Sequence, residues 1–227
     1  MIGTLRSRRR WAILGSLALL SAFTVTACAV RYLHTGSSQS SNLVWNLFLA
    51  WIPLVVALLV YDAHRRGARP VVLLAGGVAW LLFFPNAPYL LTDFKHLDTW
   101  SGVPVWFDVV LLSAAAWTGL LLGFASLYLV QSVARDLLSA AAAWAIVLAS
   151  IVLGSVGMYL GRFERWNSWD VVSSPRSLFG DLWSGVMSPA DHPRALAVTV
   201  LFAAFLTLAY VTFYSLLALG HGERESS

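Results

Sequence analysis

The residues best suited to chemistry follow a break in a long apolar run, in the stretch Phe83–Asp98, FFPNAPYLLTDFKHLD. Pro85 and Pro88 lack a backbone N–H group and disturb a helix around them. The side chains that follow are an amide, a phenol, a carboxylate and an imidazole, from Asn86, Tyr89, Asp93 and His96. The last two are three residues apart, so they share one face if the helix resumes. The stretch suits a polar binding pocket; a capped helix end with a solvated loop is the alternative.

A single acid, Asp108, lies about one turn inside another apolar run, over residues 105–130. An uncompensated carboxylate costs about 2.5–3.5 kcal/mol at the centre of a bilayer and less near the interface. We therefore expect Asp108 to face other helices and to find a basic partner there.

A third group of candidates lies in the segment 157–172, GMYLGRFERWNSWDVV. Its two arginines, close to aromatic rings, suit a carboxylate or phosphate ligand with planar, bidentate geometry. We expect these arginines to pair internally, with Asp108, Asp93 or Asp170. The alternative is an ordinary exit from the membrane, with tryptophans in the interfacial belt and arginines that reach lipid head groups. The candidates are Tyr159, Arg162, Glu164, Arg165, Trp166, Asn167, Trp169 and Asp170.

Few side chains are available for acid–base catalysis or metal binding, and they match no GxSxG, HExxH, Walker or paired-carboxylate signature. The sequence DxxHxD, which ends at Asp98, is a weak metal pattern with a single nitrogen ligand. Cys28 is the only cysteine, which excludes an intrachain disulfide and a Cys-based zinc site. We predict no metal and no cofactor, and the sequence favours a function other than catalysis. The plausible acid–base or metal residues are Asp93, His96, Asp108, Glu164 and Asp170.

The elements that must position these residues are membrane helices. Of the 227 residues, 59% are hydrophobic and only 11% are charged, whereas soluble domains carry roughly 25% charged residues. Apolar blocks of roughly 18 residues or more predict bilayer-spanning helices. The sequence thus predicts an all-α, polytopic membrane helix bundle that forms one domain over residues 1–227. The six predicted spans are 11–30, 43–61, 71–91, 105–130, 137–160 and 195–219.

The distribution of basic residues predicts the orientation of these spans. Cytoplasmic segments of membrane proteins carry an excess of Lys and Arg. With both termini inside, the inner segments hold most of the basic residues, so the net charge of +4 reflects membrane topology rather than nucleic-acid binding. All three candidate groups then lie on the outer side. The inner basic residues are Arg6, Arg8, Arg9, Arg10, Arg65, Arg66, Arg69, Arg135 and Arg224.

Two further features concern packing around the bundle. Small residues at one-turn spacing let two helices approach closely, so the fifth span is expected to pack tightly on a neighbour; these residues are Ser150, Gly154, Gly157 and Gly161. Apolar residues at helical spacing over 174–187, after a Ser-Pro start, predict a short amphipathic helix in the outer interface.

The first span has two interpretations. Its Arg-rich start, apolar centre and the sequence VTAC at residues 25–28 fit a bacterial lipoprotein signal in which Cys28 is lipidated. They also fit a plain signal-anchor helix, which we prefer, and both interpretations leave the other five spans unchanged.

The stretches FFPNAPYLLTDFKHL and GRFERWNSWDVVSSP closely resemble paired motifs of the bacterial domain-of-unknown-function family numbered 1361. The resemblance covers nearly the whole chain and implies a bacterial multi-pass membrane protein in the cytoplasmic membrane. It supplies no catalytic roles.

Three function classes follow from the residues. We favour binding or transport of a small anionic or lipid head-group ligand at the outer polar residues. The alternatives are a structural or assembly protein, whose polar residues lock helices together, and an intramembrane enzyme. The partners we expect are membrane lipids, a small anionic ligand, and a second copy or another membrane protein.

Overall fold

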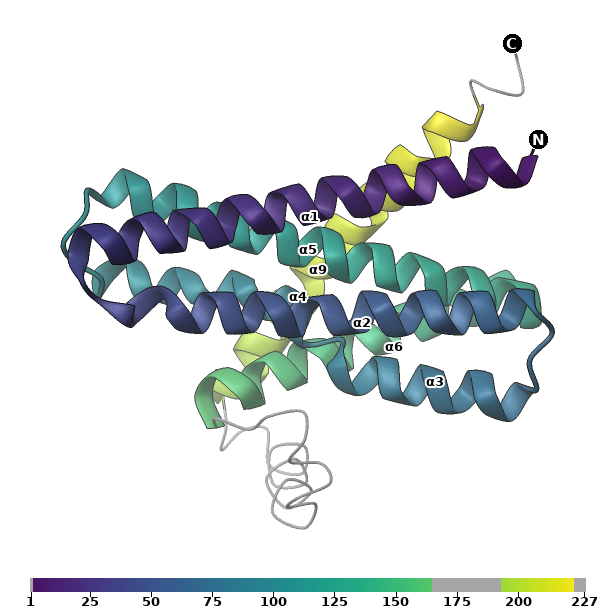
Figure 1. Ribbon diagram of the computed structural model, residues 1–227. Coiled ribbons are helices and arrows are strands. Elements are labelled where there is room, and N and C mark those ends of the chain that lie inside the picture. Colours follow the sequence, from purple (N-terminus) through teal and green to yellow (C-terminus); the bar gives the residue numbers. More distant parts are fainter. Residues whose placement is uncertain (1, 165–192, 223–227) are drawn as a thin grey trace. The chain divides into compact units, whose positions relative to one another are not determined.

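The computed structural model describes residues 2–164 and 193–222, and every element within these ranges is helical (Figure 1). The helices are α1 (Ile2–Thr35), η1 (Ser38–Ser40), α2 (Ser41–Arg65), α3 (Pro70–Phe83), α4 (Asn86–Tyr89), η2 (Leu90–Asp98), α5 (Val105–Leu137), α6 (Ala140–Tyr159), η3 (Leu160–Glu164) and α9 (Pro193–Gly222). The short helices η1 and η2 are 3-10 helices, and η3 is a π-helix.

Six of the helical stretches are long and apolar enough to cross a membrane, which confirms the six predicted spans. The structure extends most of them by several residues, because polar residues at the ends continue the helix beyond the apolar run. The stretches are 10–35, 38–65, 70–97, 105–137, 140–162 and 193–219. The protein is therefore a multi-pass membrane protein.

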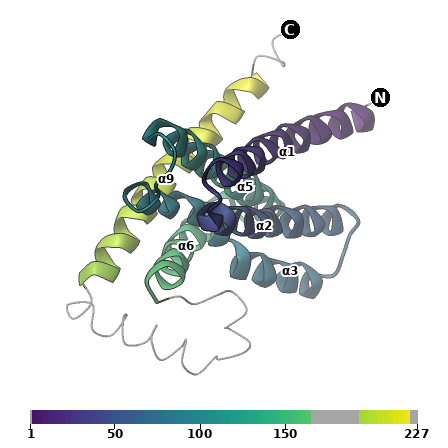
Figure 2. The same cartoon turned by 60° about the vertical axis from the view of Figure 1, so that its left-hand side comes forward.

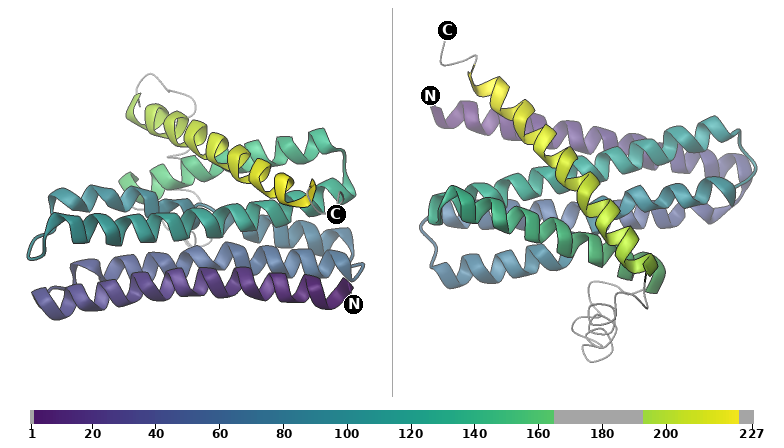
Figure 3. Two further views of the ribbon diagram at one scale, coloured as in Figure 1. Left: turned by 90° about the horizontal axis from the view of Figure 1, so that it is seen from above. Right: turned by 180° about the vertical axis from the view of Figure 1, so that it is seen from behind.

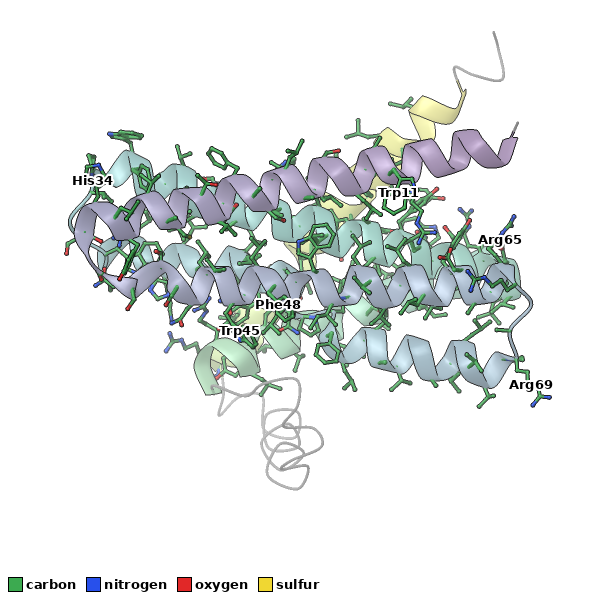
Figure 4. All side chains as sticks on the ribbon, viewed as in Figure 1. Trp11, His34, Trp45, Phe48, Arg65 and Arg69 are labelled. Atoms are coloured by element: carbon green, nitrogen blue, oxygen red, sulfur yellow. The ribbon has the colours of Figure 1, made fainter. Side chains whose placement is uncertain are left out.

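Large apolar side chains cover the outside of the helices. Trp11, Trp45 and Phe48 are 68%, 53% and 58% exposed, and Figure 4 shows them projecting away from their helices. A soluble protein seldom exposes so many large apolar groups together, whereas acyl chains would cover them in a bilayer. By contrast, Arg65 and Arg69 lie at the turn that joins α2 to α3 (Figure 4).

The chain divides into two compact units that alternate along the sequence. The first comprises Met1–Leu54 and Asn86–Gly123, and the second comprises Val55–Pro85 and Phe124–Ser227. The boundaries fall within α2, within α5, and at the proline break after α3.

In the first unit, α1 and the beginning of α2 lie side by side. The Trp51 indole Nε1 donates to the Ser21 hydroxyl at 3.0 Å, and the Cys28 thiol lies 3.8 Å from the carbonyl oxygen of Ser40. Buried residues of α2 recur at helical spacing, which is the pattern of one face packed against neighbours; they are Leu43, Leu47, Ala50 and Leu54.

The proline break is buried, which shelters its irregular backbone as membrane depth requires. Ala87 and Leu90 have no exposed surface. Gly119 of α5 faces the carbonyl oxygen of Ala87 so closely that any added Cβ would collide with it. After the break the chain continues as the 3-10 helix η2, in which residues three apart are eclipsed. This geometry keeps Asp93 and His96 on one face.

In the second unit, the last turns of α2 and the helix α3 run antiparallel, joined by a turn in which Gly67 has a φ of 77° (Figure 2). The helix α9 lies diagonally across α6 and packs on it (Figure 3).

The predicted tight packing of the fifth span is also confirmed in the second unit. A Cβ at Gly154 would lie 2.9 Å from the Phe84 ring, and a Cβ at Gly157 would lie 2.6 Å from Pro85 Cγ. The small face of α6 thus packs on the end of α3, directly before the proline break.

Candidate functional site

The centre of the candidate site is a buried ion pair between α1 and α5. Asp108 is 3% exposed and Arg31 is 0% exposed. Arg31 Nε lies 2.8 Å from Asp108 Oδ1, and Arg31 Nη2 lies 3.4 Å from Oδ2, so the two planar groups face each other. This pairing compensates the carboxylate that the sequence placed at membrane depth.

The partner of Asp108 differs from the one we expected. The sequence favoured Arg162 or Arg165, but the observed partner is Arg31. Arg31 directly follows the apolar run 11–30, so in the sequence it resembles a flanking charge. In the structure α1 continues to Thr35, so Arg31 is still within the helix and can face its neighbours. A signal was present, since Arg31 and Asp108 lie at the ends of two spans that the predicted topology puts on the same side.

The rest of the Arg31 guanidinium is only partly satisfied. Its Nη2 also donates to the carbonyl oxygen of Ser101 at 3.1 Å, and its central carbon lies 4.7 Å from the centre of the Trp100 ring, within the range of a cation–π contact. Its Nη1 is buried and has no hydrogen-bond partner among the residues that the structure describes. A buried donor left in this way costs about 1–3 kcal/mol.

The turn between η2 and α5 brings Trp100 and Ser101 to Arg31. Gly102 in this turn has a φ of 94°, a conformation that side chains disfavour. An added Cβ would also lie 2.8 Å from Thr35 Cγ2, at the end of α1. Gly102 therefore lets the turn fold tightly against α1.

A second carboxylate, Asp93, lies beside this pair in the first unit and is 3% exposed. The Asn46 side chain donates to Asp93 Oδ2 at 3.2 Å, and His96 Nε2 lies 3.9 Å from Asp93 Oδ1. The His96 ring also stacks on Trp100, with ring centres 5.2 Å apart. Asp93 is thus linked to Arg31 through His96 and Trp100.

We call this set the Arg31 cluster. Its members come from α1, α2, η2, the following turn and α5, and all belong to the first unit. The His96 side chain is 29% exposed, so the cluster is open at this point and closed around the ion pair. The arrangement places hydrogen-bond donors, one arginine and two carboxylates together inside a membrane protein. Its members are Arg31, Asn46, Asp93, His96, Trp100 and Asp108.

The other predicted site residues are distributed as follows. Asn86 and Tyr89 are half-buried on α4 in the first unit, and both have interaction partners. Tyr159 and Arg162 are half-buried in the second unit, where α6 passes into η3, and Glu164 ends η3. The third candidate group belongs to the second unit and the other two belong to the first, so convergence of all three stays a prediction. The remaining candidates, Arg165, Trp166, Asn167, Trp169 and Asp170, lie outside the described residues, as does the predicted amphipathic helix 174–187.

The structure shows a second polar group that the sequence analysis missed. It lies between α5 and α9: Tyr210 of α9 donates to Gln131 Oε1 at 2.7 Å, and Arg135 of α5 donates to the Tyr214 hydroxyl. Both pairs belong to the second unit. The available signal was the matching spacing, because the polar residues are four apart on each helix.

Within residues 2–164 and 193–222, no three His, Cys, Asp or Glu side chains lie close enough to hold a metal ion together. Asp93 and His96 are the nearest such pair in the Arg31 cluster. The chemistry visible in this cluster is therefore hydrogen bonding and charge compensation.

Six membrane spans and a buried ion pair between two of them define a polytopic helical membrane protein with a charged cluster among its helices. The chain belongs to the family described as Protein of unknown function (DUF1361), which matches residues 45–209. The match includes Asn46, Asp93, His96 and Asp108 and begins after Arg31. No curated protein and no solved structure matches the chain.

Proposed function

We propose that this membrane protein binds or transports a small anionic ligand or a lipid head group at the Arg31 cluster. The observation that supports the proposal is the buried Arg31 Nη1 group, which has no hydrogen-bond partner within residues 2–164 and 193–222. Asp108 already compensates the charge of Arg31, so the ligand would contribute an oxygen acceptor to this position. An acceptor here would remove the cost of the unpaired donor.

The entrance to the cluster also suits an anion. Lys95 is exposed on η2, and the neighbouring His96 side chain is partly exposed. These two residues would attract an anionic group to the point where the cluster is open. Trp100, which contacts both His96 and Arg31, would form the wall along which the ligand passes inward.

The proposed location is the outer face of a bacterial cytoplasmic membrane. The excess of basic residues in the segments predicted to be inside supports this orientation. With both termini inside, the turn that carries Trp100 faces outward, and the ligand enters from the outer leaflet or the outer solution.

The test uses the double variant Arg31→Met, Asp108→Leu, which removes the donor without leaving a buried charge unpaired. Replacing a buried pair by apolar residues of similar volume is often neutral for stability. We expect wild-type protein in detergent to unfold at a higher temperature with inorganic phosphate or with phosphatidylglycerol, by about 5–11 °C at 100 times Kd. The double variant should fold but show no shift. Equal shifts in both proteins would place binding elsewhere, and no shift with either probe would refute this ligand class.

A structural function is the second candidate, because the cluster joins helices far apart in sequence. Arg31 and Asp108 connect α1 to α5, and Asn46 and Asp93 connect α2 to η2. The two candidate functions predict different results when the double variant is expressed in a deletion strain that lacks this protein. If the double variant folds and restores the lost phenotype, the ion pair serves packing alone; if it folds without restoring it, the cluster is a ligand site.

A further inference from the structure

Two hydrogen-bonded pairs join α5 to α9 in the second unit. Gln131 and Arg135 are four residues apart on α5, so they lie on the same face, as do Tyr210 and Tyr214 on α9. The Tyr210 hydroxyl donates to Gln131 Oε1 at 2.7 Å. One turn further along α5, Arg135 donates to the Tyr214 hydroxyl. The two pairs are independent of the Arg31 cluster.

The Tyr210–Gln131 pair, which lies farther from the end of α5, leaves a buried polar atom unsatisfied. Gln131 is 1% exposed, and its Nε2 is buried with no hydrogen-bond partner in the part of the chain that the structure describes. Exchanging the amide nitrogen and oxygen of Gln131 does not remove the problem. The nitrogen would then bond to the Tyr210 hydroxyl, and the amide oxygen would lack a partner. Gln131 therefore has an unused hydrogen-bonding group next to Tyr210.

The Arg135–Tyr214 pair lies nearer the end of α5 and contains a positive charge that no described carboxylate neutralises. Arg135 is exposed in the last turn of α5. Among the residues that the structure describes, Arg135 forms no salt bridge, and the neighbouring Asp136 contacts His64 Nε2 at 3.1 Å. The Arg135 guanidinium also lies 5.9 Å from the centre of the Tyr214 ring. Positive charge is thus available at the end of a membrane span.

Aromatic rings surround the two pairs. Trp144 of α6 lies 5.2 Å from the Tyr214 ring, and Tyr128 of α5 lies 6.1 Å from it, centre to centre. Both rings are half-buried. Because Gln131 and Arg135 are four residues apart, the amide lies about 6 Å farther from the helix end than the guanidinium. The site therefore changes from an exposed cation to a buried amide over the length of a lipid head group.

We propose that this second group of residues binds an anionic phospholipid. The phosphate would accept hydrogen bonds from Arg135, whose guanidinium suits a phosphate oxygen pair. The acyl ester carbonyl, which lies on the hydrocarbon side of the phosphate, would accept from the Gln131 amide. The rings of Tyr128 and Trp144 would pack on the glycerol and the first methylene groups. Gln131 is enclosed, so neighbouring side chains, among them the Trp144 ring 6.1 Å from the Tyr210 ring, must shift when the ester group enters.

The experiment measures lipid binding to the full chain in detergent by native mass spectrometry. Phosphatidylglycerol and phosphatidylcholine with identical acyl chains are the two probes. We expect wild-type protein to prefer phosphatidylglycerol, and Arg135→Gln to weaken that binding about tenfold, as for one charge-assisted hydrogen bond. The matched control is Arg69→Gln, which removes another exposed charge from the second unit and should change binding less than twofold. Gln131→Met should weaken binding of both lipids about threefold, as for one neutral hydrogen bond.

Three results would overturn the proposal. These are an equal loss in Arg135→Gln and Arg69→Gln, equal binding of the two lipids by wild-type protein, and complete displacement of phosphatidylglycerol by inorganic phosphate, which would indicate a site for free anions. Arg135 is exposed, so Arg135→Gln should fold and decides the question even if Gln131→Met aggregates. The Arg31→Met, Asp108→Leu variant should keep this lipid, so failure at one site is distinguishable from failure at the other.

Discussion

Replacing Asp108 by leucine should lower the stability of the protein far more than replacing both members of its ion pair. In the single variant, Arg31 loses its hydrogen bonds at 2.8 Å and 3.4 Å and stays fully buried with an uncompensated charge. Breaking a buried pair in this way costs about 3–5 kcal/mol. For a chain of this length, each kcal/mol corresponds to about 2–4 °C, so the unfolding temperature should fall by about 6–20 °C.

The assay is thermal unfolding of purified protein in detergent, followed by size-exclusion chromatography with fluorescence detection. The double variant Arg31→Met, Asp108→Leu should unfold within a few degrees of wild type, because it buries no unpaired charge. If Asp108→Leu unfolds at the wild-type temperature, the reasoning is wrong, because the pair then contributes nothing to the packing of α1 on α5. If single and double variants lose the same stability, the loss reflects packing rather than charge.

Three further outcomes are expected. Gly119→Ala should destabilise the protein by about 1–3 kcal/mol, because its Cβ collides with the carbonyl oxygen of the α4 turn, whereas Gly77→Ala, with open space around it, should be neutral; equal unfolding temperatures would contradict this. Trp100→Leu should cost about 0.5–2 kcal/mol through the lost cation–π contact, and the exposed Trp45→Leu is its control in the same unfolding assay. An alkaline phosphatase fused after Asp98 should be active, and an inactive fusion with an active cytoplasmic reporter would reverse the proposed orientation.

The sequence determined the features that depend on composition and local spacing. Six apolar runs, each long enough for a bilayer, predict six spans because a helix of about 20 residues crosses the hydrocarbon core. The prolines at 85 and 88 predicted a break in the helix, and small residues on α6 predicted a close helix contact. The structure confirms both, because α3 ends at Phe83, before the first proline, and Gly157 lies against Pro85. These outcomes follow from the length, the prolines and the small residues of individual helices, all of which can be read from the local sequence.

The tertiary structure decided which polar groups meet. Arg31 and Asp108 are 77 residues apart, and Asn46 and Asp93 are 47 apart. Charge bias can place such residues on one side of a membrane, but it says nothing about the rotation of each helix about its axis. That rotation is set by the packing of neighbouring helices. The rotation of α1 directs Arg31 toward Asp108, although Arg31 resembles a flanking charge in the sequence.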